Sequence, residues 1–256
     1  EAMDLTTVLG ISLALCIASL VVSFQGSISV YWDLEAFLIA VGGTFASTLL
    51  NTPWSNLLNA IKSSFSLLFT SKYNAAAVIP IMKKLSEKAK KDGIFALKNE
   101  GKGWSDFFLE KAISLLVLNF NAHAIKSILE NEIMETRARH KEIINIIRTV
   151  ALYAPVFGLF GTLLGVIQVL TKIGNPAAVG PAMATAVMAS VYGILLAYLI
   201  FHPIAGKLRL RNEEEILAKA MILDAILLIR SQEMPSVVEK HLCSYLGIQP
   251  SFKKSA

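Results

Sequence analysis

The stretch that decides the architecture of this chain reads Ala154-Pro155-Val156-Phe157-Gly158-Leu159-Phe160-Gly161-Thr162-Leu163-Leu164-Gly165. It lies in an uncharged run, Thr149–Thr171, that is long enough to cross a bilayer as a helix. Pro155, Gly158, Thr162 and Gly165 are spaced at i, i+3, i+7 and i+10, so they share one helical face, which Gly161 adjoins. Small residues let another helix approach closely in lipid. The stretch therefore predicts a membrane helix that packs closely on a neighbour.

Three further apolar runs are long enough to span a membrane, and they are Leu5–Phe24, Leu34–Leu50 and Val179–Ile204. Backbone groups in lipid must be satisfied within the segment, so all four runs are interpreted as helices. The alternative, buried helices of a soluble protein, fits poorly with only 17% charged residues and four long charge gaps. The predicted fold class is an all-α integral membrane protein with four transmembrane helices and a helical cytoplasmic domain.

The distribution of Lys and Arg predicts the orientation. None of the 24 precedes Lys62, 15 lie between Lys62 and Arg148, one lies between the last two spans, and eight lie between Lys207 and Lys254. Cytoplasmic loops carry the excess of positive charge, so the middle segment, the tail and both termini are predicted to be cytoplasmic. The predicted divisions are residues 1–52 (first two spans), 53–146 (cytoplasmic loop), 147–204 (last two spans) and 205–256 (cytoplasmic tail).

The cytoplasmic segments have helical periodicity. Asn74 is expected to cap a helix that Gly93 ends, and Ser105 to cap the next helix. From about Ala122 the pattern continues unbroken into the third span, and the fourth span continues into Lys207–Arg230, which predicts two long helices. Three interpretations of the basic run at residues 83–91 stay open: a solvated helix face, a docking patch or a site of attraction to anionic lipid.

None of the 19 Asp and Glu residues lies deep inside a span. Pumps and transporters usually keep an ionisable group in the membrane. Either this chain conducts nothing or a partner supplies the carboxylate.

Signals of enzymes and of metal or cofactor sites are missing from the sequence. It has no Gly-rich phosphate loop and no nucleophile elbow, its four histidines lack metal-ligand spacing, and its two cysteines form no disulfide framework. The net charge of +5 comes from residues beside apolar runs, which argues against nucleic-acid binding. We therefore expect no catalytic residue, no metal and no cofactor.

Further motifs occur in order along the chain. They include Lys90–Leu97 in the loop, Gly180–Ala184 and Tyr192–Tyr198 in the fourth span, and His202–Ala205 at its inner end. Together with the Pro155–Gly165 run, they make essentially the whole chain resemble the MotA/PomA channel subunits of bacterial flagellar stators.

The resemblance implies a multi-pass protein of the bacterial inner membrane that couples ion flow to torque on the rotor. In that family a ring of subunits, expected to be a pentamer, surrounds a dimer of a single-span MotB-type partner. The partner carries the ion-binding aspartate, and the cytoplasmic loop drives the rotor protein FliG. A carboxylate supplied by a partner agrees with the absence of one deep inside the spans of this chain.

Site residues carried over from the family fall into four groups. Pro155 and Thr162 are expected to line the ion path, with Ser190 and Ala189 nearby. Tyr198 and Pro203 are expected to support the gating region. Close helix packing is assigned to Gly158, Gly161, Gly165 and Gly193, and the rotor contact to Lys90, Lys91, Lys98 and Glu100. From spacing alone, ordinary packing within the helix bundle explains the small residues equally well.

Two departures from the family pattern bear on the mechanism. Lys98 stands where the family usually has an acidic residue, with Glu100 two residues on, so the usual charge-paired rotor contact is in question. Sodium-driven members share a pair of threonines where this chain has Ala189 and Ser190, which favours protons. The alternatives are an ion-driven motor of the TolQ/ExbB or gliding type, which typically has three spans, and a non-conducting membrane scaffold.

Overall fold

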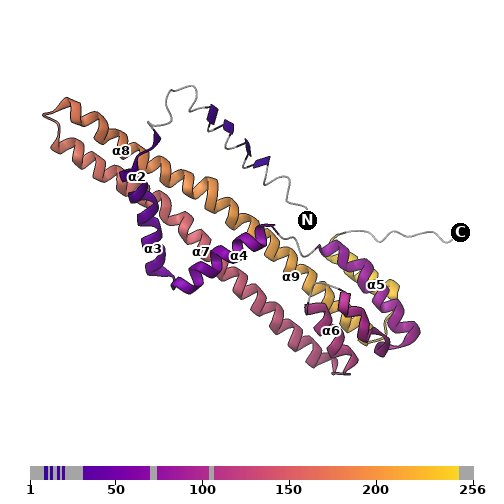
Figure 1. Ribbon diagram of the computed structural model, residues 1–256. Coiled ribbons are helices and arrows are strands. Elements are labelled where there is room, and N and C mark those ends of the chain that lie inside the picture. Colours follow the sequence, from indigo (N-terminus) through magenta and orange to yellow (C-terminus); the bar gives the residue numbers. More distant parts are fainter. Residues whose placement is uncertain are drawn as a thin grey trace. The chain divides into compact units, whose positions relative to one another are not determined.

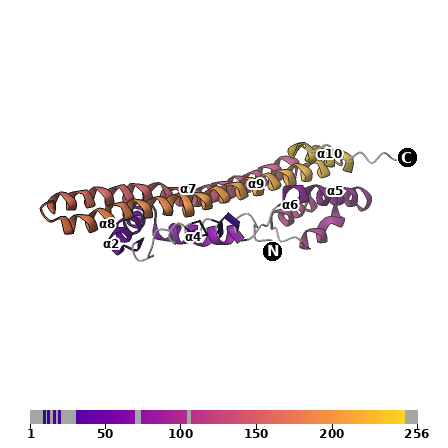
Figure 2. The ribbon, with the colours of Figure 1, turned by 90° about the horizontal axis from the view of Figure 1, so that it is seen from above.

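The computed structural model describes residues 9–10, 12–13, 16–17, 19–20, 31–69, 74–103 and 107–247, and its regular structure there is helical throughout. Figures 1 and 2 show its elements: α2 (Leu34–Phe37), η2 (Leu38–Gly42), α3 (Gly43–Asn51), α4 (Trp54–Phe69), α5 (Ala75–Asp92), η3 (Ile94–Gly103), α6 (Phe107–Val117), α7 (Ala122–Thr171), α8 (Pro176–Leu195), η4 (Leu196–Phe201), α9 (His202–Arg230) and α10 (Pro235–Tyr245). The predicted all-α class is confirmed.

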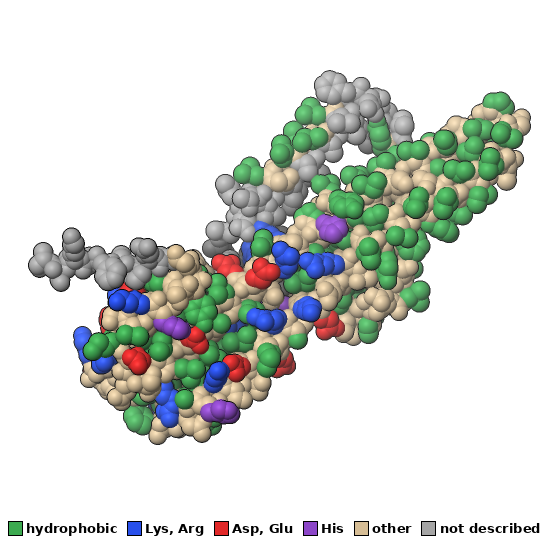
Figure 3. Space-filling view, turned by 180° about the vertical axis from the view of Figure 1, so that it is seen from behind, with side chains coloured by type: hydrophobic (Ala, Val, Ile, Leu, Met, Phe, Trp, Pro, Cys, Tyr) green, Lys and Arg blue, Asp and Glu red, His purple; other side chains and the backbone are tan. Residues whose placement is uncertain are grey.

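Three described helical segments are long and apolar enough to cross a membrane: Leu34–Asn51, Ala122–Thr171 and Pro176–Arg230. In the most apolar 18-residue stretch of each segment, only 22%, 33% and 28% of the residues are buried. Most of these side chains therefore face outward, as expected of helices that contact lipid or another subunit. Figure 3 shows hydrophobic side chains covering this part of the chain. The first predicted span, Leu5–Phe24, lies largely outside the described residues, and those of its residues that are described are helical.

The chain forms two compact units. The first unit comprises residues 1–70 and 141–209, and the second comprises residues 71–140 and 210–256. Because the boundaries cut α7 and α9, each of these long helices contributes to both units. Both continue without interruption, as the sequence pattern predicts.

In the first unit, the second span keeps one narrow face buried through a π-helical turn. Ala36, Ala40, Thr44 and Thr48 are four residues apart and have no exposed surface. An α-helix repeats every 3.6 residues, so a four-residue spacing drifts around it unless an extra residue is inserted, which η2 supplies. The hydroxyls of Thr44 and Thr48 donate to backbone carbonyls one turn earlier, which satisfies them without a partner helix.

The fourth span also contains a π-helical turn, η4, toward its C-terminal end. Gly193, Ala197 and Ala205 are buried at multiples of four residues, and η4, which contains Ala197, lies between Gly193 and Ala205. Past η4, Ala205 packs with Leu208 against Ile144 and Ile147 of α7. The π-helical turn therefore keeps one side of this helical run facing α7 within the first unit.

The second unit has a large apolar core. Its α5 begins where the Asn74 side chain accepts from the backbone N–H of Ala76 (3.0 Å) and ends at Gly93, whose φ is +82°. Both helix ends were predicted from the sequence and are confirmed, whereas Ser105 lies outside the described residues. Residues from five helices and η3 share the core, among them Met82, Leu97, Phe108, Leu129, Ile222 and Leu242.

Candidate functional site

The third and fourth spans meet through glycine. A Cβ atom built on Gly193 would lie 2.5 Å from the carbonyl oxygen of Ala154, and one on Gly165 would lie 2.3 Å from Cβ of Ala186. The backbones of α7 and α8 therefore approach each other so closely at Gly165 and Gly193 that no side chain larger than hydrogen fits there. In Figures 1 and 2, α8 lies alongside α7 over this region.

Gly161 and Gly158 extend the same contact. A Cβ on Gly161 would lie 2.4 Å from Cβ of Ala189 and 3.2 Å from Cγ2 of Ile39, so α7 meets both the fourth and the second span at this level. A Cβ on Gly158 would lie 3.0 Å from the carbonyl oxygen of Ala189. The structure thus brings the four glycines of the sequence analysis to one helix interface.

Pro155 and Thr162 lie at the edge of that interface, and both are half-buried. The Thr162 hydroxyl donates to the carbonyl of Leu159 (2.6 Å), which leaves lone pairs on its oxygen that can accept or coordinate. Pro155 has no N–H, so the Ala151 carbonyl loses the usual helical donor. This edge of α7 therefore presents oxygen atoms at two levels within the membrane.

Ser190 and Ala189 reach the same part of α7 from α8. The Ser190 hydroxyl lies 3.4 Å from the carbonyl oxygen of Gly158, to which it donates, at a level between Pro155 and Thr162. Ala189 is completely buried against Gly161. Ser190 therefore offers a hydroxyl group at this level, whereas the neighbouring Ala189 contributes only packing.

At the N-terminal end of the second span, a polar cluster ties that span to the fourth. Asp33 caps α2 by accepting from the N–H of Ala36, and its second carboxylate oxygen accepts from the Thr185 hydroxyl (2.5 Å). The Tyr192 hydroxyl accepts from the Asp33 N–H (3.0 Å) and donates to the carbonyl of Tyr31 (2.5 Å).

Sequence reasoning did not single out this cluster. An Asp directly before an apolar run is a recognisable helix-start signal, which could have identified the cap. Its partners are more than 150 residues away along the chain and carry no such signal.

A further hydrogen bond joins the second span to α7, where the Gln168 side-chain amide donates to the Glu35 carboxylate (3.2 Å).

At the C-terminal end of the fourth span, the Tyr198 ring stacks on His202 with a centroid separation of 5.1 Å. Tyr198 is 63% exposed, and Pro203 is also exposed. Pro203 cannot donate to a carbonyl of the preceding turn, at the point where η4 ends. These two residues therefore lie at an irregular turn, away from the glycine contact.

The residues proposed for the rotor contact lie on the second unit. Lys90, Lys91 and Lys98 are exposed, and the Lys90 ammonium donates to the carbonyl of Gln232 (3.4 Å). Glu100 is bound to Lys88 (2.5 Å), and that hydrogen-bonded ion pair holds the pKa of the Glu100 carboxyl below its usual range. Lys98 is thus presented to solvent, while Glu100 is engaged within the chain.

This membrane arrangement offers hydroxyl and carbonyl oxygens but no charge. Residues 149–171 and 176–201 contain no Asp or Glu. Among the described residues, no group of three or more His, Cys, Asp or Glu side chains could hold a metal ion. Neutral oxygens can relay or partly coordinate a cation, but a bare charge in a low-dielectric region needs an opposite charge.

Comparisons with known proteins agree with one another. Residues 101–221 match the MotA/TolQ/ExbB proton channel family. The chain is 31% identical to the chemotaxis protein PomA of Vibrio alginolyticus over 96% of both chains, and 32% identical to motility protein A of Borreliella burgdorferi over 86% of this chain and 84% of the relative.

Solved structures match over nearly the whole chain as well. The C. jejuni MotAB structure superposes with a TM-score of 0.87 at 25% identity, covering 99% of this chain and 98% of the other. The flagellar MotAB stator complex of Bacillus subtilis gives a TM-score of 0.86 at 26% identity, covering 95% and 96%.

Proposed function

This chain belongs to the MotA/PomA family of flagellar stator ion-channel subunits, and from that premise we propose how its residues act. It is a multi-pass membrane protein of a channel family and not of an enzyme family. Its third and fourth spans form one wall of an ion path that a MotB-type partner completes. The partner supplies the ion-binding aspartate, and this chain supplies the neutral oxygens around it.

A single observation carries this proposal. Along the α7–α8 contact lie the hydroxyls of Thr162 and Ser190 and the Ala151 carbonyl that Pro155 leaves without its helical donor, in spans that contain no carboxylate. The small residues beside them bring the backbones together and leave the edge narrow enough for a further helix to lie against it. A partner helix carrying a carboxylate would provide the charge that this edge lacks.

We propose protons as the driving ion. Sodium needs several oxygen ligands, and position 189 has no hydroxyl because alanine packs there against Gly161. A proton needs only the partner's carboxylate and an oxygen to pass it on. The family profile, which is that of a proton channel, supports the same assignment.

The remaining parts of the proposal concern orientation and assembly. Residues 53–146 and 205–256, which hold nearly all the Lys and Arg, face the cytoplasm, and both termini lie there, with the protein in the bacterial inner membrane. Several copies, in a pentameric ring, surround the partner. Lys90, Lys91 and Lys98 contact the rotor protein FliG, while Tyr198 and Pro203 support gating at the inner end.

Replacement of Thr162 by Val tests the ion path, because it keeps the shape and removes the hydroxyl. We expect Thr162→Val to lower ion flux and motility about tenfold with normal expression and assembly, since the hydroxyl oxygen proposed to accept from or pass on the ion is lost. Thr171→Val is a matched control, because the Thr171 hydroxyl likewise donates to the carbonyl three residues earlier but lies at the end of α7. Equal, unimpaired motility in both variants would assign Thr162 to packing and favour the scaffold alternative.

A further inference from the structure

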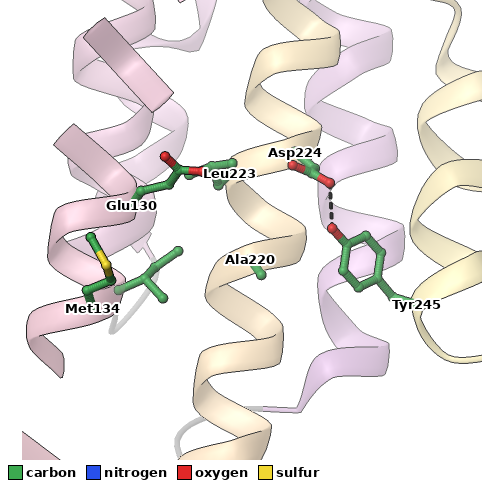
Figure 4. Close-up of a pocket in the computed structure, with 7 residues that line it drawn as sticks. Glu130, Met134, Ala220, Leu223, Asp224 and Tyr245 are labelled. Carbon is green, nitrogen blue, oxygen red and sulfur yellow. Dashed lines mark hydrogen bonds between the residues drawn. The ribbon is translucent and has the colours of Figure 1, made fainter. Parts of the chain in front are cut away.

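The second unit carries an open pocket of about 460 Å³ between α7 and α9, beside the end of α10. Figure 4 shows Glu130 and Met134 on one side, Ala220 and Leu223 opposite, and Asp224 hydrogen-bonded to Tyr245 at the far edge. The floor is apolar and is formed by Ile133, Met134, Ala220 and Leu223. Met134 is 59% exposed, so the described residues leave this apolar surface open to solvent.

The pocket has an acidic rim whose two carboxylates differ. Asp224 accepts from the Tyr245 hydroxyl (2.5 Å) and lies 3.1 Å from Nε2 of His241. The hydrogen bond to Asp224 and partial burial raise the pKa of Tyr245 to about 12, so the phenol stays protonated and keeps donating. Glu130 is more exposed, and its ion pair with Lys126 is long, at 3.8 Å. Glu130 is therefore the carboxylate better placed to attract a cation from outside the pocket.

The chain itself contains a segment of complementary chemistry close by. Residues 248–256 read Ile-Gln-Pro-Ser-Phe-Lys-Lys-Ser-Ala, with Phe252 followed directly by Lys253 and Lys254. They begin three residues after Tyr245, which lines the pocket. The seven residues from Tyr245 to Phe252 can span up to about 23 Å when extended. Gly247, at φ +63°, provides the break from the α10 helix that a change of direction needs.

We infer that the pocket binds the C-terminal segment of its own chain, with Phe252 on the apolar floor and Lys253 and Lys254 against Glu130. The aromatic ring of the segment suits the apolar floor, and its two ammonium groups are opposite in charge to the exposed Glu130 carboxylate. Single exposed ion pairs are weak, so this contact is expected to be readily reversed. This inference does not depend on the proposed ion path.

Disulfide cross-linking in the full chain, assembled with its partner subunit in membranes, tests the contact. The background carries Cys16→Ser and Cys243→Ala, and the test variant adds Met134→Cys and Phe252→Cys. The control variant pairs Phe252→Cys with Met234→Cys, because Met234 is 61% exposed, matching Met134, but does not line the pocket. Under mild oxidation we expect an intrachain disulfide to form at least about tenfold faster in the test variant than in the control.

Charge-reversal variants in the same cross-linking assay test the ionic part of the contact. Glu130→Lys in the test variant should slow cross-linking about fivefold, and adding Lys253→Glu with Lys254→Glu should restore much of the rate. Equal cross-linking rates in the test and control variants would overturn the inference. A cross-linking rate in the test variant that changes with neither charge reversal would overturn it as well. A disulfide that forms between chains, detected as a dimer on a denaturing gel, would assign the pocket to a second copy and also overturn it.

Discussion

The two long helices of this protein pack by opposite rules in its two units. In the first unit, α7 meets α8 through glycine and alanine, with Gly193 too close to Ala154 for any side chain. In the second unit, the same α7 meets α9 through large apolar side chains and a buried polar network. There Lys219 donates to Thr136 (3.3 Å), pairs with Glu215 (3.0 Å) and lies 5.4 Å from the centre of the Phe108 ring.

The contrast follows from the solvent of each region. Water drives apolar side chains together, so a unit surrounded by water is stabilised by a core such as that around Phe108 and Met221. Lipid tails are as apolar as leucine, so association in the membrane depends on dispersion contacts between closely fitting backbones. Small residues therefore hold the helices together in the first unit, whereas in the core of the second unit they would leave cavities.

Removal of the buried ammonium should have the largest effect. Lys219→Met removes the closer partner of Glu215, a carboxylate that is only 13% exposed and whose remaining neighbour, His140, lies 3.7 Å away. Breaking this buried pair should lower the free energy of unfolding by about 3–5 kcal/mol. The melting temperature of the purified complex measures this loss. Lys126→Met is the matched control, since Lys126 also forms an i,i+4 pair but in solvent, and should cost at most about 0.5 kcal/mol.

The double replacement Lys219→Met with Glu215→Leu sharpens the same point. Apolar replacement of both partners removes the desolvation cost together with the attraction, so most of the lost stability should return. A double variant as unstable as Lys219→Met alone would mean that packing around Phe108, and not charge pairing, is what the lysine provides.

A methyl group at the membrane interface should have an intermediate effect. Gly193→Ala forces Cβ to within 2.5 Å of the Ala154 carbonyl oxygen, so α7 and α8 must separate, at a cost of about 1–3 kcal/mol. Gly206→Ala is the control, because nothing lies within 4 Å of its added Cβ, and better helix propensity should make it neutral or slightly stabilising. Equal thermal stability of the two variants would show that the interface tolerates separation.

The exposed pair on the second unit should have the smallest effect and a definite pH dependence. The pKa of Glu100 is depressed below 4.5 by Lys88, so the pair contributes stability above that value and loses it as the pH falls through the depressed pKa. Glu100→Gln should therefore lower the melting temperature slightly at pH 7 and not at all at acid pH. Lys88→Gln should show the same pH profile, and a profile that rises toward acid pH would contradict the sign of the interaction.

The sequence predicted the helical class, the two long helices and the caps at Asn74 and Gly93, because these depend on local patterns of charge, hydropathy and capping residues. It also brought Pro155, Thr162 and the glycines onto one face by spacing alone. Other features depend on residues that are distant along the chain. The hydrogen bond from Thr185 to Asp33 joins residues 152 apart, and the pairing of Lys219 with Thr136 joins residues 83 apart.

The π-helical turns show a subtler limit of sequence reasoning. The four-residue repeat of Ala36, Ala40, Thr44 and Thr48 is visible in the sequence, but small residues at that spacing are also compatible with a regular helix. Only their complete burial along one side, through η2, shows that the helix must widen to keep them aligned. The roles of Pro155, Thr162, Ser190, Tyr198 and Pro203 in an ion path remain proposals that geometry alone supports.

The central claim, that this chain contributes neutral oxygens to a path whose charge comes from a partner, is tested most directly by proton flux into vesicles. Three preparations are compared: this chain alone, the chain with its MotB-type partner, and the chain with a partner whose membrane aspartate is replaced by asparagine. Because moving a bare charge through hydrocarbon is prohibitively costly, we predict flux only in the preparation with the intact partner. Substantial flux from this chain alone, or from the chain with the asparagine partner, would contradict the account.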